Sequence, residues 1–345
     1  MTIGLDISNL HSLNKTRGVG FYTEHLYEAL KKYTPEQVVL IEDSNSKPKV
    51  DLIHYPFFDP FMMTLPLIKN HPTMVTIHDV IPLLFPQHYP PGIKGKVKNN
   101  IQKIALKNVQ AFITDSECSK KDIIKVLGIN PKKVFVTYLA PAEHFRVIKD
   151  LAQLARIKKK YNLPDRFGLF TGNVNWNKNL VNISQACVDA DLDLVLVGKS
   201  FENRSNLDHP EKRSYAHFLS KYSNSALVHM LGFVPDEDLV AIYNLATVLV
   251  MPSFYEGFGM TMLEAQACGT PVVTSNISSI PEVVGKGATF VNPEKVIQIL
   301  QAIEAILNNQ QLRDNLVRLG FDNIKKFTWQ KTAIATAKVY QQILK

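Results

Sequence analysis

The sequence predicts an α/β protein made of two doubly wound, Rossmann-like domains that face each other across a cleft. Short runs of β-branched and aromatic residues recur along the 345 residues and alternate with segments of helical periodicity. Most of these runs are apolar throughout, which is typical of parallel strands covered by helices on both faces. At roughly 100–200 residues per domain, a chain of this length is expected to form two domains.

Twelve strands are expected, in two series of six. The first series covers residues 3–7, 38–41, 51–55, 74–78, 110–114 and 134–138, and the second covers 167–171, 193–197, 226–230, 247–251, 271–274 and 288–291. A polar, lysine-rich stretch from Ile148 to Asp165 separates the two series. We therefore expect a first domain over residues 1–150, a second over 151–327, and a last helix over 328–345 that crosses back to the first domain.

The composition excludes several classes of protein. The three cysteines lie far apart and form no CxxC pair, which disfavours a disulfide framework and a zinc site. The N-terminus lacks the pattern of a signal peptide, and the most apolar stretch, Leu239 to Met251, is shorter than the ~20 residues of a membrane span. We expect a cytoplasmic protein, with peripheral attachment to the inner face of the membrane as a further option.

The segment after the strand at 247–251 carries the strongest functional signal. A turn with the sequence Gly257-Phe258-Gly259 precedes a helix that is expected to begin near Met260. Free backbone N–H groups at a helix N-terminus, here those of Gly259 to Thr261, attract anions, because the unpaired donors and the helix dipole both favour negative charge. A phosphate group is therefore the expected ligand of this turn.

Two glutamates flank this turn and need an explanation, because a carboxylate repels an anion. Glu256 and Glu264 could accept hydrogen bonds from the hydroxyls of a nucleotide sugar, Glu256 from the sugar and Glu264 from the ribose. The alternative is structural: one carboxylate caps the helix and the other is a solvated helical residue.

The whole segment, EGFGMTMLEAQACGTPVV from Glu256 onward, resembles the E-x7-E signature of the retaining glycosyltransferases of family 4. The sequence IPEVVG at 280–285 is also similar to that family, and the resemblance spans nearly the full chain. It implies the GT-B fold and transfer of a hexose from a nucleotide-diphosphate sugar to a hydroxyl of a glycan or of a lipid-linked acceptor. It also implies that Glu256 is catalytic and that Glu264 binds the donor.

Other strand ends of the second domain match segments that bind the donor in this family. The resemblance assigns to Lys178 a contact with the diphosphate, and it places Asn173, Lys199 and Val234 near the nucleotide. Asn173 and Asn177 stand where members commonly have an arginine. The resemblance therefore implies that fewer cationic side chains contact the leaving diphosphate here. For Lys178 and Lys199, the alternative is an ordinary surface lysine in a turn.

In the first domain, the resemblance points to two places. Gly18 and Gly20 belong to the expected loop that approaches the donor sugar, where the absence of a Cβ permits close contact. His78 follows the strand at 74–78 and matches a histidine that contacts the sugar, while Asp79 could orient the acceptor hydroxyl. A structural hydrogen bond is the alternative role for His78.

The segments HDVIPLLFP and TRGVGFYT are most like bacterial mannosyltransferases of polysaccharide assembly, which implies GDP-mannose as the donor. The family usually needs no divalent metal and no cofactor beyond this co-substrate, so we expect no metal site. A sugar-nucleotide epimerase or another GT-B enzyme is the alternative. A dehydrogenase is disfavoured because no complete G-x-G-x-x-G follows a strand.

The positive charge is concentrated in one region. The chain has a net charge of +8, and residues 92–133 hold ten lysines against three acids, a local charge of +7. The stretch from Lys94 to Lys107 has the spacing of an amphipathic helix with a basic face. We expect residues 92–133 to suit an anionic membrane surface or a lipid-diphosphate acceptor, with a solvated helix as the alternative. Nucleic acid is the least expected partner, because no binding motif is present.

Overall fold

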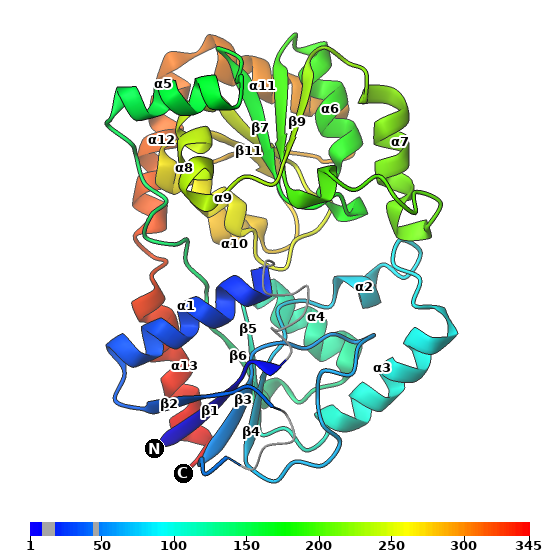
Figure 1. Ribbon diagram of the computed structural model, residues 1–345, viewed down its shortest axis with the longest axis vertical. Coiled ribbons are helices and arrows are strands. Elements are labelled where there is room, and N and C mark those ends of the chain that lie inside the picture. The colour runs from blue at the N-terminus through cyan, green and yellow to red at the C-terminus, as the bar shows by residue number, and fades with distance from the viewer. Residues whose placement is uncertain (9–17, 44–47) are drawn as a thin grey trace. The chain divides into compact units, whose positions relative to one another are not determined.

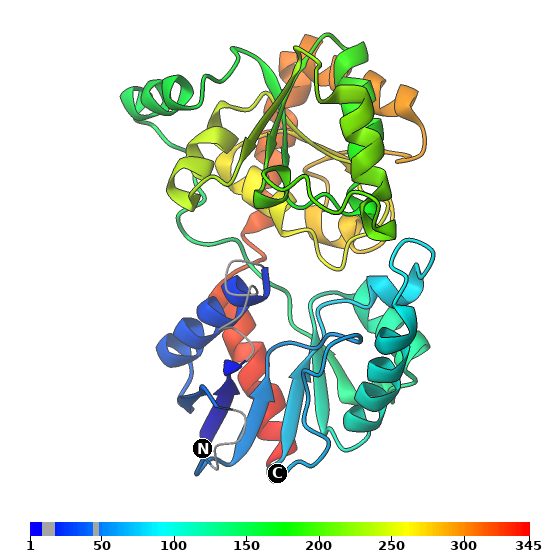
Figure 2. The same ribbon diagram turned by 45° about the vertical axis from the view of Figure 1, so that its right-hand side comes forward.

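The computed structural model describes residues 1–8, 18–43 and 48–345, and these form two compact units (Figures 1 and 2). The first unit consists of Met1–Ala140 together with Phe327–Lys345, and the second of Pro141–Lys326. Each unit is a single parallel sheet of six strands with helices packed against it.

The sheet of the first unit has the order β2-β1-β3-β4-β5-β6, and every pairing is parallel. Its strands are β1 (Thr2–Asp6), β2 (Gln37–Ile41), β3 (Leu52–Tyr55), β4 (Thr73–Thr76), β5 (Ala111–Thr114) and β6 (Val134–Val136). Its helices are α1 (Gly18–Tyr33), α2 (Ile81–Leu84), α3 (Gly92–Leu106), α4 (Glu117–Leu127), the short 3-10 helix η2 (Pro131–Lys133) and α13 (Trp329–Ile343).

The sheet of the second unit has the order β12-β11-β10-β7-β8-β9, again with all pairings parallel. Its strands are β7 (Phe167–Thr171), β8 (Asp193–Val197), β9 (Val228–Gly232), β10 (Val248–Met251), β11 (Val272–Ser275) and β12 (Thr289–Val291). Its α-helices are α5 (Leu151–Lys160), α6 (Leu180–Asp189), α7 (Arg213–Tyr222), α8 (Asp236–Leu245), α9 (Met260–Cys268), α10 (Ile280–Val284), α11 (Val296–Asn308) and α12 (Gln310–Ile324). Three short 3-10 helices complete it: η3 (Trp176–Lys178), η4 (Lys199–Phe201) and η5 (Pro210–Lys212).

The predicted fold class is confirmed, and each of the twelve expected strands is present within about two residues of its predicted bounds. The agreement has a physical cause. Central strands such as β5, β7 and β10 are buried along their whole length, so their sequences are apolar runs that stand out from the helices.

The division between the units falls at Ala140 and Pro141, ten residues before the expected boundary. Residues 141–150 lie on the second unit, where the ring of Phe145 packs edge-on against Tyr243 at 5.7 Å. The Ile148 N–H donates to Asn244 Oδ1 at 2.8 Å, and the Asn244 amide donates to the Arg146 carbonyl at 3.0 Å. The lysines that suggested a linker belong to the exposed end of α5, which follows this segment.

The last helix, α13, packs against α1 in the first unit, and the two helices lie side by side in both views (Figures 1 and 2). The Tyr340 hydroxyl meets His54 Nδ1 at 2.8 Å, and His54 Nε2 meets Thr76 Oγ1 at 2.7 Å. Burial lowers the pKa of His54 to about 3, so this imidazole is neutral at pH 7. The hydrogen bonds therefore satisfy a buried polar side chain and tie α13 to β3 and β4.

At the carboxyl edge of the second sheet, two neighbouring strands end in glycines that touch. Gly172 follows β7 and Gly198 follows β8, and the Gly172 N–H donates to the Val197 carbonyl at 2.9 Å. A Cβ on Gly198 would lie 2.0 Å from the Gly172 carbonyl oxygen. This edge is thus closed so tightly that only glycine fits at position 198.

We expect Gly198→Ala to destabilise the second unit by about 3 kcal/mol or more, because backbone must move to relieve the overlap. Gly172→Ala is the matched control: its φ of 140° is also positive, but its nearest new contact is a Met251 methyl at 3.9 Å. Urea unfolding followed through Trp176, in a Trp329→Phe background, measures both. Equal losses in the two variants would contradict the steric argument.

Candidate active site

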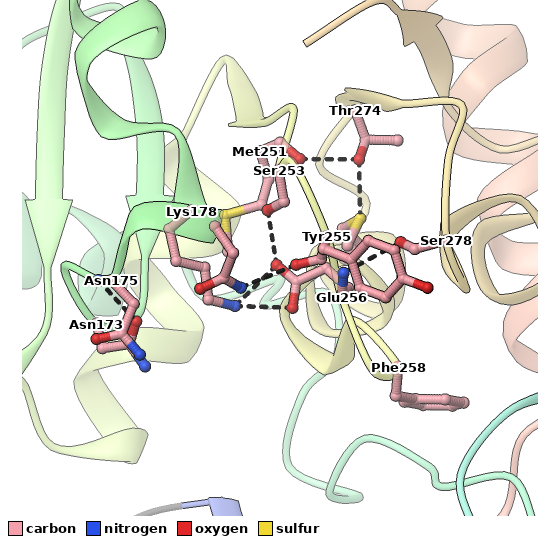
Figure 3. Close-up of polar contacts among 12 residues, drawn as sticks. Asn173, Asn175, Lys178, Met251, Ser253, Tyr255, Glu256, Phe258, Thr274 and Ser278 are labelled. Atoms are coloured by element: carbon pink, nitrogen blue, oxygen red, sulfur yellow. Dashed lines mark hydrogen bonds and ion pairs between the residues drawn. The ribbon is translucent and has the colours of Figure 1, made fainter. Parts of the chain in front are cut away.

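The centre of the candidate site is a buried ion pair between Lys178 and Glu256. Lys178 Nζ donates to Glu256 Oε1 at 2.8 Å and to Oε2 at 2.9 Å, and the Ser253 hydroxyl donates to Oε1 at 2.6 Å (Figure 3). The two side chains are only 16% and 7% exposed. A carboxylate buried this far needs a cation and hydrogen bonds, and this arrangement supplies both.

The backbone around Glu256 is held by short polar side chains. Asn177 is buried, and its side-chain amide donates to the Tyr255 carbonyl at 2.8 Å. Its backbone carbonyl accepts from the Phe254 N–H at 2.7 Å. The Glu256 N–H donates to Ser278 Oγ at 3.1 Å, and the Ser279 hydroxyl donates to the Glu256 and Phe258 carbonyls, both at 2.9 Å. The loop from 253 to 259 is therefore fixed before any ligand binds.

Helix α9 begins at Met260, as predicted, and its N-cap is Gly259 with a φ of 107°. No side chain caps this end, so the first N–H groups of the helix are left to other acceptors. Gly257 and Phe258 are buried, whereas Met260 and Thr261 are partly exposed at the helix start. The helix dipole and these donors together favour an anion here.

Glu264 lies one turn into α9 and accepts a hydrogen bond from the Tyr243 hydroxyl at 2.8 Å. The same hydroxyl is 2.8 Å from Thr171 Oγ1, at the end of β7. Burial raises the pKa of Glu264 to about 7, and the bond from Tyr243 opposes that rise. Glu264 is thus a positioned carboxyl group whose charge changes near neutral pH.

Three further predicted residues lie at the carboxyl edge of the same sheet. Asn173 is exposed after β7 and accepts from the Asn175 N–H at 3.2 Å (Figure 3). Lys199 is exposed in η4 after β8. Val234 is buried after β9, next to Phe233, whose ring is largely exposed. In open parallel sheets, ligands bind at this edge.

In the first unit, His78 follows β4 and contacts Asp115, which follows the neighbouring strand β5. His78 Nδ1 lies 2.7 Å from Asp115 Oδ2, so Nδ1–H donates to the carboxylate. Burial lowers the pKa of His78, but the Asp115 carboxylate, with smaller contributions from the Asp79 carboxylate and the Pro56 backbone, outweighs it and the pKa is raised. Within the described residues, His78 Nε2 is buried and has no partner in the protein.

The remaining predictions for the first unit fare differently. Asp79 Oδ1 accepts from the Ile81 N–H at 2.9 Å, at the start of α2, so part of its carboxylate serves the backbone. Gly18 and Gly20 were expected in a loop, but both lie in the first turn of α1, with Gly20 buried. The helical spacing of apolar residues begins only at Tyr22. It does not indicate this first turn, because glycine has no side chain that would mark the buried face of a helix. Arg17, which precedes them, lies outside the described residues.

Sequence reasoning missed several residues that hold the candidate site. They are Asp115, Tyr243, Thr171 and Ser253. Asp115 and Thr171 lie at strand ends, so the rule that directed attention to His78 could have found them. Tyr243 lies inside α8 and carries no local signal. In the described part of the chain, no group of three or more His, Cys, Asp or Glu side chains could hold a metal ion.

Comparison with known families gives matches to two family profiles. Residues 153–321 match the profile described as glycosyl transferases group 1, and residues 16–140 match the profile described as glycosyltransferase family 4. Together these matches cover most of the chain.

Curated relatives include two proteins from Escherichia coli. The chain is 27% identical to O-antigen chain mannosyltransferase B over 273 residues, which is 78% of this chain and 70% of the relative. It is 30% identical to the serotype-specific mannosyltransferase WbdA over 297 residues, 83% of this chain but 35% of WbdA. The chain thus spans about a third of WbdA.

Among solved structures, sucrose-phosphate synthase from Thermosynechococcus elongatus superposes with a TM-score of 0.75. The alignment covers 99% of each chain at 19% identity. At this level of identity, the similarity establishes the fold, a GT-B arrangement of two Rossmann-like domains, and nothing finer.

The pKa of Glu264 generates a prediction about stability. Its folded-state pKa of about 7 exceeds the ordinary 4.5, so the folded protein holds a proton that the unfolded chain has lost between these values. Stability therefore falls as pH rises from about 4.5 to about 7 and is level above. Glu264→Gln lacks this fall. Between pH 4.5 and about pH 8, we expect its free energy of unfolding to rise relative to that of the wild type by about 2–3 kcal/mol.

Urea unfolding across this pH range, followed through Trp176 in the Trp329→Phe background, measures the effect. Glu237→Gln, an exposed glutamate of α8, should leave the pH dependence of the wild type unchanged. A parallel pH dependence for Glu264→Gln and wild type would show that folding does not change the pKa of Glu264.

A second prediction concerns the histidine in the first unit. Asp115→Asn removes the carboxylate that contributes most to the raised pKa of His78, while burial still lowers it and Asp79 and the Pro56 backbone still raise it. We expect the His78 pKa to be lower in this variant than in the wild type, as measured by the pH dependence of its imidazole nitrogen resonances in NMR. His78→Gln identifies the resonances. An unchanged midpoint would contradict the pairing.

Proposed function

This chain belongs to the family 4 glycosyltransferases, and from that premise we propose that it transfers mannose, with retention of configuration, from GDP-mannose to a hydroxyl of a glycan or lipid-linked glycan. The observation that carries the proposal is the buried pair of Lys178 and Glu256 immediately before the uncapped N-terminus of α9. The pair joins a fixed cation and a fixed carboxylate next to an anion site.

The hydrogen bonds of the pair leave capacity for a substrate. A lysine ammonium has three N–H donors, and two of them go to Glu256, so the third can reach a phosphate oxygen. A carboxylate accepts about four hydrogen bonds. Lys178 and Ser253 supply three to Glu256, which leaves room for one sugar hydroxyl. Glu256 can therefore orient the sugar while Lys178 neutralises the leaving group.

The start of α9 supports the departure of the diphosphate. Negative charge grows on this group as the glycosidic bond breaks, and N–H donors that are already fixed stabilise it without reorganisation. In the proposed mechanism, the amides at Gly259, Met260 and Thr261 provide these donors. The leaving diphosphate accepts the proton of the attacking hydroxyl, and attack comes from the face of departure, so no enzyme nucleophile is required. The proposal includes no divalent metal.

Glu264 and His78 complete the assignment. We assign the Glu264 carboxylate to the ribose hydroxyls, with Tyr243 holding its second oxygen in place. His78 Nε2 is assigned to a hydroxyl of the sugar, as an acceptor in the neutral imidazole and as a donor in the imidazolium that Asp115 favours. Lys199, Asn173 and the backbone at Val234 are assigned to the nucleotide.

The choice of mannose rests on the relatives, of which one is named as an O-antigen chain mannosyltransferase and another as a serotype-specific mannosyltransferase. The direct test is a screen of nucleotide sugars for protein-dependent release of nucleoside diphosphate, with the anomeric configuration of the product read by NMR. GDP-mannose should be the preferred donor. Conversion of a nucleotide sugar without transfer would favour an epimerase instead.

Variants of the ion pair test the mechanism. Glu256→Gln and Lys178→Gln should each slow transfer by about a hundredfold or more, because each removes a charge that acts on the reacting groups. Each should also destabilise the second unit, since the remaining charge stays buried without its partner. The double variant should recover stability but not activity, which separates catalysis from folding.

Initial rates of nucleotide release and urea midpoints provide the two measurements. Glu237→Gln and Lys159→Gln, both exposed, are the matched controls and should behave as wild type. Full turnover by Glu256→Gln would refute the assigned role of the carboxylate.

A further inference from the structure

We propose that helix α3 lies in the surface of an anionic lipid bilayer, with its stripe of β-branched residues inserted among the lipids. The observation is the orientation of the helix. Ile93, Val97 and Ile104 are 85%, 53% and 57% exposed, whereas the residues that α3 buries are Gly95, Gln102, Ala105 and Leu106. This stripe of three apolar side chains thus points away from the protein.

The inward face of α3 is built for close packing with segment 61–69. A Cβ on Gly95 would lie 3.7 Å from the ring of Phe61, and the Gln102 amide donates to the Met62 carbonyl and to Thr64 Oγ1. Lys69 Nζ donates to the Ala105 carbonyl. Because these contacts fix which side of α3 faces the protein, the exposed stripe is a consequence of the fold.

Lysines flank the stripe on both sides. Successive residues of an α-helix turn by about 100°, so Lys96 and Lys103 lie on one side of the stripe and Lys94 and Lys98 on the other. All four are exposed, and there is no acidic residue from Ile93 to Lys107. A helix with an apolar stripe between rows of lysines is the pattern of helices that lie in a membrane surface.

Segment 61–69 adds further apolar surface beside the helix. Met62, Met63, Leu67 and Ile68 are all exposed, Ile68 at 81%. Figures 1 and 2 both show α3 at the edge of the first unit that is remote from β2. Elsewhere, exposed apolar side chains such as Phe233, Phe290 and Ile297 come from separate elements of the second unit. Large apolar patches are unusual on a monomer surface and indicate a partner.

The chemistry of the patch favours lipid over other partners. A second copy of the chain would bring two lysine-rich, acid-free faces together, and these repel each other. Protein interfaces are depleted in lysine and enriched in aromatic residues, whereas α3 carries exposed lysines on both sides of the stripe and contains no aromatic residue. Nucleic acid would pair with the lysines but offers nothing to the isoleucines. An anionic bilayer has acidic headgroups for the lysines and hydrocarbon for the stripe. In the described residues, no helix has the length and apolarity to span a membrane, so the contact is with the surface.

Co-sedimentation of the full chain with lipid vesicles tests the proposal. The assay contains no sugar nucleotide, so its result is independent of the proposed reaction. Vesicles contain phosphatidylcholine alone or mixed with phosphatidylglycerol. The wild type should bind the mixed vesicles, and salt should weaken binding. Replacing Ile93, Val97 and Ile104 together with Ser, or Lys94, Lys96, Lys98 and Lys103 together with Gln, should each reduce the affinity by about tenfold or more.

Matched controls lie in the second unit. Ile297→Ser removes an exposed isoleucine. A second control replaces Lys159, Lys221, Lys286 and Lys295 together with Gln, which removes as much positive charge as the lysine variant of α3. Neither control should change vesicle binding. Ile93→Trp reports insertion, because its emission should shift to shorter wavelength on vesicles and be quenched by brominated lipid.

Several results would overturn the proposal. The proposal is wrong if the wild type does not bind the mixed vesicles, or if the serine variant binds them as tightly as the wild type. It is also wrong if the emission of Ile93→Trp does not shift while the protein is bound. Light scattering that shows a dimer of wild type and a monomer of the serine variant would assign the stripe to a second copy. Loss of vesicle binding in the control variants to the same extent would attribute the effect to net charge or general surface change.

Discussion

The ion pair between Lys178 and Glu256 is the constraint on which the second unit's site depends. It joins the segment after β7 to the loop after β10, and these strands are neighbours in the sheet. A buried carboxylate is stable only when a cation and hydrogen bonds surround it, so the loops that carry the pair must be held in register. Asn177, Ser278 and Ser279 do this by binding the loop backbone. The same fixation brings Glu256 directly before the start of α9.

The first unit repeats this construction with different residues. His78 follows β4 and Asp115 follows β5, and these strands are also neighbours. In both units, the polar side chains meet because parallel strands end at one edge of the sheet. In the second unit, β7 and β10 also flank the point where the strand order reverses, which is where open parallel sheets bind ligands. The consequence is that each of these candidate residues has its orientation set by a partner from the next strand: Glu256 by Lys178, and His78 by Asp115.

The basic charge of the protein gains a physical meaning from the orientation of α3. Charge alone is compatible with solvent, nucleic acid or a membrane. The packing of Gly95 and Gln102 against segment 61–69 turns Ile93, Val97 and Ile104 outward, between the lysines. An acceptor carried on a lipid is itself at a membrane surface, so attachment there would confine enzyme and acceptor to the same plane and raise their effective concentration.

The sequence by itself determined the twelve strands and the start of α9 at Met260, because each depends on a local pattern. Its resemblance to a known family singled out Glu256 and Lys178 as candidate residues. Tertiary structure decided that Lys178 pairs with Glu256, 78 residues away in sequence, and that Asn177, expected to weaken a phosphate clamp, holds the Tyr255 carbonyl. It also decided that residues 141–150 join the second unit and that the stripe of α3 faces outward. These features follow from strand order and from packing between distant segments, and neither is encoded in the periodicity of any one segment.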